Sequence, residues 1–275
     1  MRGDAGAQLM LEKPGPVLRV VLIGLFVIWL GFALSLNWGG ASDEAFFLFT
    51  GNTDAILAGQ LWRLVTAPLL HVPSGGIGHL LSALLGLYFL GASLETSFGS
   101  GRFARFLIGS AVLAYGTQVL VTWVLGPSPR LVPPHYFGAM PVVEAVAIAW
   151  ACSFQGRTVN LFFVLPIGTR GLIAFVVGLN LLYLIAGALP PAGHIAMFAG
   201  MGYGYLLGGG TPSPLRRAYL RFRLARLEAE VRTEGVARRK RARESGLRVI
   251  SGGKQDKHTD KHNDKDKGGG KHLLH

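Results

Sequence analysis

The sequence predicts an all-α fold, a polytopic membrane protein whose chain crosses the bilayer six times. Half of the 275 residues are hydrophobic and only 15% are charged, whereas soluble domains carry about 25% charged residues. The mean hydropathy is positive, at +0.40. The apolar residues gather into long runs, and the segments between them hold glycine, proline and arginine. This composition and this patterning are typical of membrane proteins.

Six apolar runs are predicted to form the spanning helices. The second run contains no Asp, Glu, Lys or Arg, and its one ionisable residue is His79. An ionisable residue in a spanning helix marks a functional or cavity-facing position, although a histidine at headgroup level is an equal alternative. In chain order the expected spans cover residues 20–36, 77–94, 103–125, 138–153, 171–186 and 194–208.

Two further segments are expected at the membrane interface. Residues 37–76 form a long loop with glycine and proline breakers, and Phe46 to Phe49 in it suit a surface half-buried among lipid headgroups. Residues 159–167, broken by Pro166, are expected to lie in the interface between the fourth and fifth spans.

Charge and periodicity divide the chain into four regions. Beyond residue 212, 18 Lys+Arg against 8 Asp+Glu carry most of the net charge of +12. Within residues 214–247, one apolar stripe flanked by arginines predicts a basic amphipathic helix; it consists of Leu220, Leu224, Leu227 and Val231. We expect a short cytoplasmic N-terminal tail (1–16), the membrane domain (17–210), the basic cytoplasmic helix (211–250) and a disordered Lys/Asp/His-rich tail (251–275).

The distribution of basic residues predicts the orientation in the membrane. Six spans place both ends of the chain on one side, and 25 of the 27 Lys and Arg residues then fall on that side. Cytoplasmic segments carry this excess, so both termini are expected in the cytoplasm. The protein itself is expected to lie in the bacterial inner membrane. The basic helix is expected to bind anionic lipids, and no nucleic acid is expected as a partner.

The segment from Leu61 to Arg102 resembles the rhomboid intramembrane serine proteases. The pair Trp62-Arg63 resembles the family's membrane-embedded first loop, and His79 matches the histidine of its second helix. Glu95 and Gly99 match the turn after that helix. The resemblance covers residues 15–210. It implies a six-helix bundle, and it implies that Trp62, Arg63, His79 and His194 are binding or site residues.

The same resemblance shows that the catalytic apparatus is incomplete. The family's nucleophile is a serine in a Gly-x-Ser-Gly turn, and here that turn reads Gly138-Ala139-Met140-Pro141. A thioether has no proton to lose, and Pro141 removes a backbone N–H beside the expected oxyanion. Ala83 stands where the family has an oxyanion-binding asparagine. His194 matches the family's catalytic histidine, so a histidine remains without its nucleophile.

Glu144 is an acidic residue within an expected span, four residues after Met140 and so on the same helix face. A carboxylate at that depth needs a partner, and the alignment offers His194. The favoured interpretation is a buried pair that locks the fourth and sixth helices together. The alternatives are a metal site made by Glu144, His79 and His194, a general base for water-using chemistry, and a protonated or water-exposed Glu144.

These observations predict a pseudoprotease that binds transmembrane segments or membrane-protein clients without cleaving them. The alternatives are an active intramembrane serine endopeptidase with Ser82 as nucleophile, and a membrane metalloenzyme or transporter built on the Glu/His set. No cofactor is expected. The single cysteine, Cys152, excludes an intrachain disulfide and a thiolate metal cluster within this chain.

Overall fold

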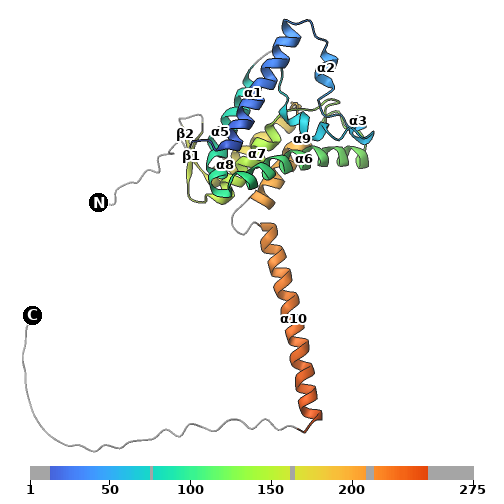
Figure 1. The fold of residues 1–275 in the computed structure, drawn as a ribbon, viewed down its shortest axis with the longest axis vertical. Helices are drawn as coiled ribbons and strands as arrows, with labels where there is room; N and C mark the ends of the chain where they lie inside the picture. Colours follow the sequence, from blue (N-terminus) through green and yellow to red (C-terminus); the bar gives the residue numbers. More distant parts are fainter. Residues whose placement is uncertain (1–12, 75–76, 162–164, 209–213, 247–275) are drawn as a thin grey trace, which may run out of the picture. The chain divides into compact units, whose positions relative to one another are not determined.

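The structure is a computed structural model that describes residues 13–74, 77–161, 165–208 and 214–246 (Figure 1). The chain divides into two compact units, residues 1–222 and 223–275. The first unit holds the membrane domain, and the second holds most of the long helix α10 (Pro214–Glu244). Most of the expected N-terminal tail and all of the tail expected over 251–275 lie outside the described residues.

The six expected helices are present in the membrane domain. Within the described residues, three of them are long and apolar enough to span a bilayer, α1 (Pro16–Asn37), α5 (Gly78–Phe98) and α6 (Ser100–Leu125). The other three are shorter: α7 (Met140–Ser153), α8 (Thr169–Ile185) and α9 (His194–Tyr203), which continues as a π-turn, η2 (Gly204–Gly208). At about 1.5 Å per residue, α7 and α9, each taken by itself, are shorter than a hydrocarbon core about 30 Å thick. Both follow irregular segments that contain proline.

The long loop between α1 and α5 is built from short helices, α2 (Asp43–Phe47), α3 (Thr53–Leu57), α4 (Arg63–Thr66) and the 3₁₀ turn η1 (Ala67–Leu69). Asn52 caps α3, because its side-chain oxygen accepts a hydrogen bond from the Ala55 N–H at 2.9 Å. Such a cap satisfies one of the free N–H groups of a helix start.

The segment over residues 159–167, which is expected to lie in the interface, belongs to a hairpin. Strands β1 (Thr158–Leu161) and β2 (Leu165–Gly168) pair antiparallel, with Thr158 opposite Gly168. The β-branched residues at 158, 159 and 167 suit a strand. Pro166, which is expected to break this segment, is accommodated in β2 opposite Asn160, since a proline is tolerated in an edge strand. Among the described residues, this hairpin is the one named sheet in the predicted all-α fold.

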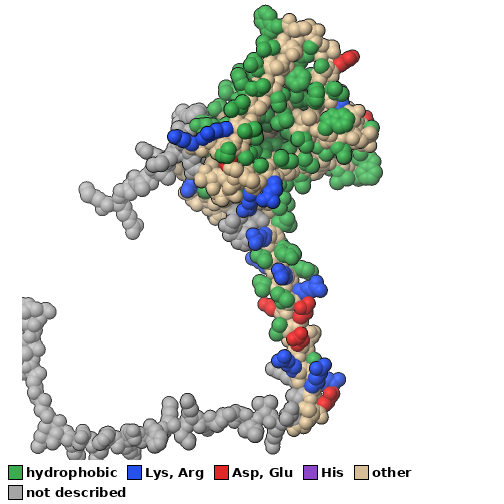
Figure 2. Space-filling model, viewed as in Figure 1, with side chains coloured by type: hydrophobic (Ala, Val, Ile, Leu, Met, Phe, Trp, Pro, Cys, Tyr) green, Lys and Arg blue, Asp and Glu red, His purple; other side chains and the backbone are tan. Residues whose placement is uncertain are grey.

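Helix α7 lies in the middle of the membrane domain. It packs against α5, α6, α8, α9 and η2, and every residue from Pro141 to Ala151 is buried. By contrast, α1, α6 and α8 each expose large apolar side chains on part of their surface, as Figure 2 shows for the visible face. A helix that is apolar all round and buried belongs to a core, and exposed apolar faces suit lipid. The site must therefore be assembled around α7.

The backbones of α7 and α9–η2 approach closely through small residues. A Cβ added at Gly200 would collide with the Pro141 carbonyl oxygen, and one at Gly204 with the Ala145 carbonyl oxygen. A Cβ at Gly208 would meet the side chain of Ala149. These glycines recur every four residues, as do their partners on α7. The spacing is that of the small residues that allow membrane helices to pack closely.

Glu95 connects the start of α1 to the turn between α5 and α6. Its buried carboxylate accepts hydrogen bonds from the N–H groups of Val17 and Leu18, each at 3.0 Å, and from the Ser100 hydroxyl at 2.7 Å. An acidic group at a helix N-terminus is favoured because the first N–H groups of the helix lack partners and carry partial positive charge. Glu95 therefore serves the fold.

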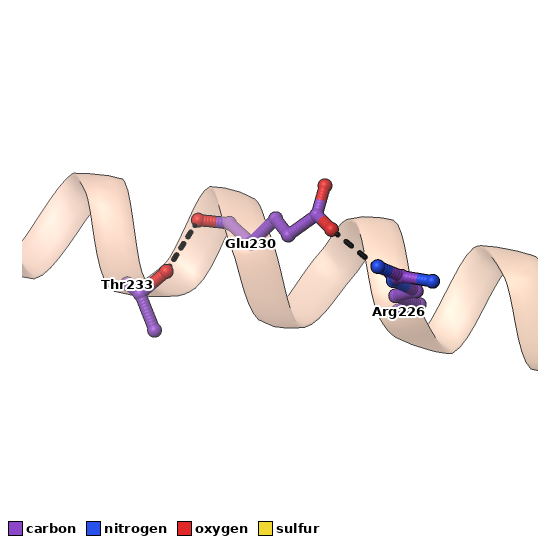
Figure 3. A network of polar contacts seen from close by, with 3 residues as sticks. All are labelled: Arg226, Glu230 and Thr233. Carbon is purple, nitrogen blue, oxygen red and sulfur yellow. Dashed lines mark hydrogen bonds and ion pairs between the residues drawn. The ribbon is translucent and has the colours of Figure 1, made fainter.

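Helix α10 lies within the segment expected to form the basic helix and ends at Glu244. Its stripe residues Leu220, Leu224, Leu227 and Val231 are all exposed. Figure 3 shows one local support of the helix, in which Arg226 Nε lies 3.4 Å from Glu230 Oε1 and the Thr233 hydroxyl donates to the Glu230 carbonyl. An exposed pair at this spacing contributes a few tenths of a kcal/mol to the stability of a helix. Most of the stability of α10 must therefore come from helix propensity and from its environment.

The contact between α7 and η2 can be tested with a matched glycine pair. Gly204→Ala should lower the thermal unfolding temperature of the purified protein, because its Cβ meets backbone of α7; overpacking costs about 1–3 kcal/mol. Gly202→Ala, two residues away with open space around its Cβ, should leave the temperature unchanged or raise it, since alanine favours a helix. Equal behaviour of the two variants would contradict the close approach.

Candidate functional site

The N-terminus of α7 is the centre of the candidate site. The chain enters it through Gly138, whose φ of 116° is one that residues with side chains rarely adopt. A Cβ at Gly138 would lie 2.8 Å from Cε1 of His79, so the glycine also leaves room for the imidazole. Pro141 occupies the first turn of α7, where its missing N–H has no helical acceptor anyway. Met140 thus stands at the head of the helix, with its sulfur 3.8 Å from the Ser82 hydroxyl.

The turn before α7 is held from three sides. The Gly138 N–H donates to the Ala67 carbonyl at 2.9 Å, and the Phe137 N–H donates to the Pro191 carbonyl at 3.0 Å. The Tyr115 hydroxyl donates to the Gly138 carbonyl at 2.7 Å. The loop before α5, the third span and the turn before α9 therefore all fix the entry into α7.

His79 lies in the first turn of α5 beside a second imidazole, His71. The ring centroids are 4.9 Å apart, and both nitrogens of His71 are buried without a hydrogen-bond partner. His71 belongs to the loop before α5, and burial together with the neighbouring His79 lowers its pKa to about 4. A buried imidazole with a low pKa is neutral at physiological pH, so His71 places no charge beside His79.

His194 opens α9 after Gly193, whose φ is 80°. The His194 N–H donates to the Leu131 carbonyl at 2.9 Å, and Gln118 Oε1 accepts from the Ala196 N–H at 3.1 Å. The polar neighbour of its imidazole is the backbone of Ala188, and Nδ1 is buried without a hydrogen-bond partner. The histidine is kept in place by the backbone around it.

The pairing predicted between Glu144 and His194 is wrong. Glu144 Oε1 instead accepts a 2.6 Å hydrogen bond from Nδ2 of Asn180, on α8, and Oε2 is buried without a partner. The four-residue spacing from Met140 gave the face of α7 that carries Glu144, but it did not identify the residue that pairs with the carboxyl. The neighbour of Glu144 on that side is the fifth helix, α8. Among the described residues, no group of three His, Cys, Asp or Glu side chains could hold a metal ion. The proposed Glu144–His79–His194 metal site is therefore not assembled.

A cleft of about 280 Å³ lies in front of the head of α7. It borders three of the residues singled out in the sequence, His79, Ser82 and Met140. His194, Glu144 and Ala83 are buried but do not line it. The rest of its wall is mostly apolar and consists of Tyr183, Ala188, Leu189, Pro190, Pro191, Ala192 and Met197.

Ser82 is the serine that borders this cleft. Its hydroxyl donates to the His79 carbonyl at 3.0 Å and lies 3.8 Å from the Met140 sulfur. Neither group is a base that could take its proton, and a serine needs such a base to become a nucleophile. In this arrangement the cleft can hold apolar groups and offer an imidazole edge, and the hydrogen bonds of the Ser82 hydroxyl go to a carbonyl and a thioether.

Arg63 of the Trp62-Arg63 pair organises the loop before α5. It donates to the carbonyls of Phe47 (2.7 Å) and Thr50 (2.6 Å) through Nη1 and to Gln60 Oε1 (2.7 Å) through Nε. Its side chain is buried, whereas Trp62 is 51% exposed. A charge-assisted donor to several carbonyls holds irregular backbone together, so Arg63 shapes the loop and neither residue reaches the cleft.

Sequence reasoning missed several residues that hold the site. Gln118 and Asn180 are polar residues within apolar runs, a signal that points to a buried partner in a membrane, and both have one. Tyr115 stacks on Tyr136 with ring centroids 5.5 Å apart. His71 carries no spacing signal of its own, and the structure places it beside His79.

The fold and the site define a helical membrane protein with a mostly apolar cleft at the head of a buried helix. A family model for the rhomboid domain matches residues 58–211, which is more than half of the chain. The protein therefore belongs to the rhomboid family, as the resemblance of the Leu61–Arg102 segment had indicated.

Three curated relatives are similar to this chain. Rhomboid protease GluP of Bacillus subtilis is 25% identical over 187 residues, which is 67% of this chain and 33% of the relative. RHOMBOID-like protein 12, mitochondrial, of Arabidopsis thaliana is 25% identical over 60% of this chain and 48% of its own length. The putative rhomboid protease YdcA of Bacillus subtilis is 30% identical over 38% of this chain and 50% of its own length. The matches span about a third to a half of each relative.

Proposed function

We propose that this protein is a non-catalytic rhomboid that binds transmembrane segments of other membrane proteins in the cleft and leaves them intact. The observation that carries the proposal is Met140 at the head of α7, where it borders the cleft and is followed by Pro141. Hydrolysis of a peptide bond needs a nucleophile and donors for the oxyanion. Met140 supplies no nucleophile, and Pro141 supplies no N–H.

The wall of the cleft supports the binding of an apolar segment. Most of its residues are apolar, and Met140 and Met197 are flexible side chains that adapt to different partners. At about 280 Å³ it accommodates a few side chains of a helix rather than a whole helix, so recognition would rest on a short part of the client. His79 and the Ser82 hydroxyl at the edge suit exposed polar backbone groups of such a segment.

An active serine endopeptidase is the second candidate, because two of the curated relatives are named rhomboid proteases and Ser82 is a hydroxyl that borders the cleft. The contacts of Ser82 weigh against it, since they are to a carbonyl and a thioether. A metal or transport function has less support, because Glu144 pairs with Asn180 instead of a histidine.

The proposal predicts binding without hydrolysis. A fluorescent single-span reporter peptide should bind saturably to the protein in lipid nanodiscs and stay intact, and a fluorophosphonate should not label the protein. Leu189→Trp, which fills the cleft, should weaken binding, while Leu182→Trp on the exposed side of α8 should not. Cleaved peptide, or labelling that disappears in Ser82→Ala, would favour the endopeptidase instead.

We also propose that the protein lies in a bacterial inner membrane with both termini in the cytoplasm. The support is the excess of Lys and Arg on one side of the six helices. A phosphatase reporter that is active only outside the cytoplasm, fused after His275, should therefore be inactive, and a cytoplasmic reporter at the same place should be active. The opposite result would invert the orientation.

The basic helix α10 is proposed to bind the anionic leaflet. Its exposed Leu220, Leu224, Leu227 and Val231 alternate with arginines, and a basic residue near an anionic surface contributes about 1 kcal/mol. In the full-length protein, α10 should therefore associate with a membrane that contains anionic lipids, and this association should weaken as salt rises. The reason is that exposed charges are screened within about 8 Å at physiological ionic strength.

This prediction is measured by protection of α10 from trypsin, which cleaves after its arginines, in nanodiscs with and without anionic lipid. Protection should appear with anionic lipid at low salt and weaken at high salt. Equal protection in neutral nanodiscs would leave the apolar stripe as the sole cause.

A further inference from the structure

Glu144 and Asn180 form a buried polar pair between α7 and α8 that the proposed binding role does not use directly. Their side chains are 5% and 2% exposed. Asn180 Nδ2 donates to Glu144 Oε1 at 2.6 Å and to the Val176 carbonyl at 3.0 Å. Two oxygens of the pair, Glu144 Oε2 and Asn180 Oδ1, are buried without a partner. Unpaired buried oxygens are costly in a protein and more so in a membrane.

The hydrogen count of the pair explains both unpaired oxygens together. An ionised carboxylate only accepts hydrogen bonds, and an asparagine amide has two N–H donors. Both donors are already used, one within α8 and one on Glu144. An ionised pair therefore has no hydrogen left for Oε2 or for Oδ1. One added proton on Oε2 creates a donor, and the Asn180 oxygen is the acceptor that lacks one.

We propose that Glu144 carries this proton and forms a neutral acid–amide ring with Asn180, in which Oε2–H donates to Oδ1 while Nδ2–H donates to Oε1. The ring satisfies all four polar atoms with two parallel hydrogen bonds. In the described part of the chain, no charged group interacts with the Glu144 carboxyl that could stabilise its ionised form. A neutral pair also avoids burying a charge within the membrane domain.

The ring acts as a positioning pair for the cleft. Between residues 173 and 185 of α8, Asn180 is the buried residue, while the other buried residues of the helix, Thr169 and Leu172, lie at its start. Tyr183, three residues after Asn180, lines the cleft, and α8 leads into the Ala188–Ala192 wall. The ring therefore holds the cleft end of α8 against α7. This step rests on the proposed function, whereas the ring itself does not.

Substitutions that keep or break the ring test it. Glu144→Gln preserves both hydrogen bonds, because an amide donates where the acid did, so the unfolding temperature should match that of the wild type. Glu144→Leu and Asn180→Leu each leave one polar partner unpaired and should lower it by roughly 2–12 °C. The double leucine variant should recover most of the loss. Glu230→Leu, which removes an exposed carboxylate on α10, is the control.

Infrared spectroscopy reads the proton directly. The difference spectrum between the wild type and Glu144→Gln at neutral pH should contain the carbonyl stretch of a protonated carboxylic acid. A carboxylate band in its place, or leucine losses that simply add, would overturn the ring.

Reporter-peptide binding separates the ring from the proposed function. Binding should be retained in Glu144→Gln and reduced in Asn180→Leu. Equal binding by the two variants would overturn the positioning role. If no variant and no wild-type protein binds the peptide, the proposed function and the positioning role both fail, while the stability and infrared results still decide the ring.

Discussion

The close contact between α7 and α9–η2 is the constraint on which the membrane domain depends. In a bilayer, apolar burial does not distinguish a helix neighbour from a lipid tail, so helices are held by close packing and by polar contacts. Gly200 and Gly204 let the backbone of the sixth helix touch the carbonyls of Pro141 and Ala145. No residue with a side chain fits there without moving a helix. The two short helices thereby become one unit, with Met140 and His194 at their heads.

The surrounding elements fix the ends of this unit by contacts to its backbone rather than to catalytic side chains. Tyr115 and Ala67 hold the turn at Gly138, and Leu131 and Gln118 hold the start of α9. None of these contacts involves the side chain at position 140. The scaffold can therefore keep its shape when methionine stands in the position of a nucleophile. This independence is the physical basis that we propose for a rhomboid in which the cleft is kept and the nucleophile is absent.

Much of the fold could be predicted from the sequence because apolar runs are local signals. The helices were predicted in this way, and the match to the family histidine gave the position of His194, which begins α9. The partner of Glu144 could not be found, since four-residue spacing gives the face of a helix and not its neighbour. The hairpin of β1 and β2 was missed because a short apolar run with a proline is ambiguous. His71 and Tyr136 acquire their places only through long-range contacts.

The most direct test of the account is to see where a client helix lies and whether it survives. A photo-crosslinking amino acid at Leu189, in the cleft wall, and at Leu182, on the exposed face of the same helix, would be compared in membranes that contain a single-span protein. The account predicts a crosslink from Leu189 that exceeds the one from Leu182, with a product whose mass equals that of both intact chains. Equal crosslinking from the two positions, or a product that contains a cleaved client, would contradict it.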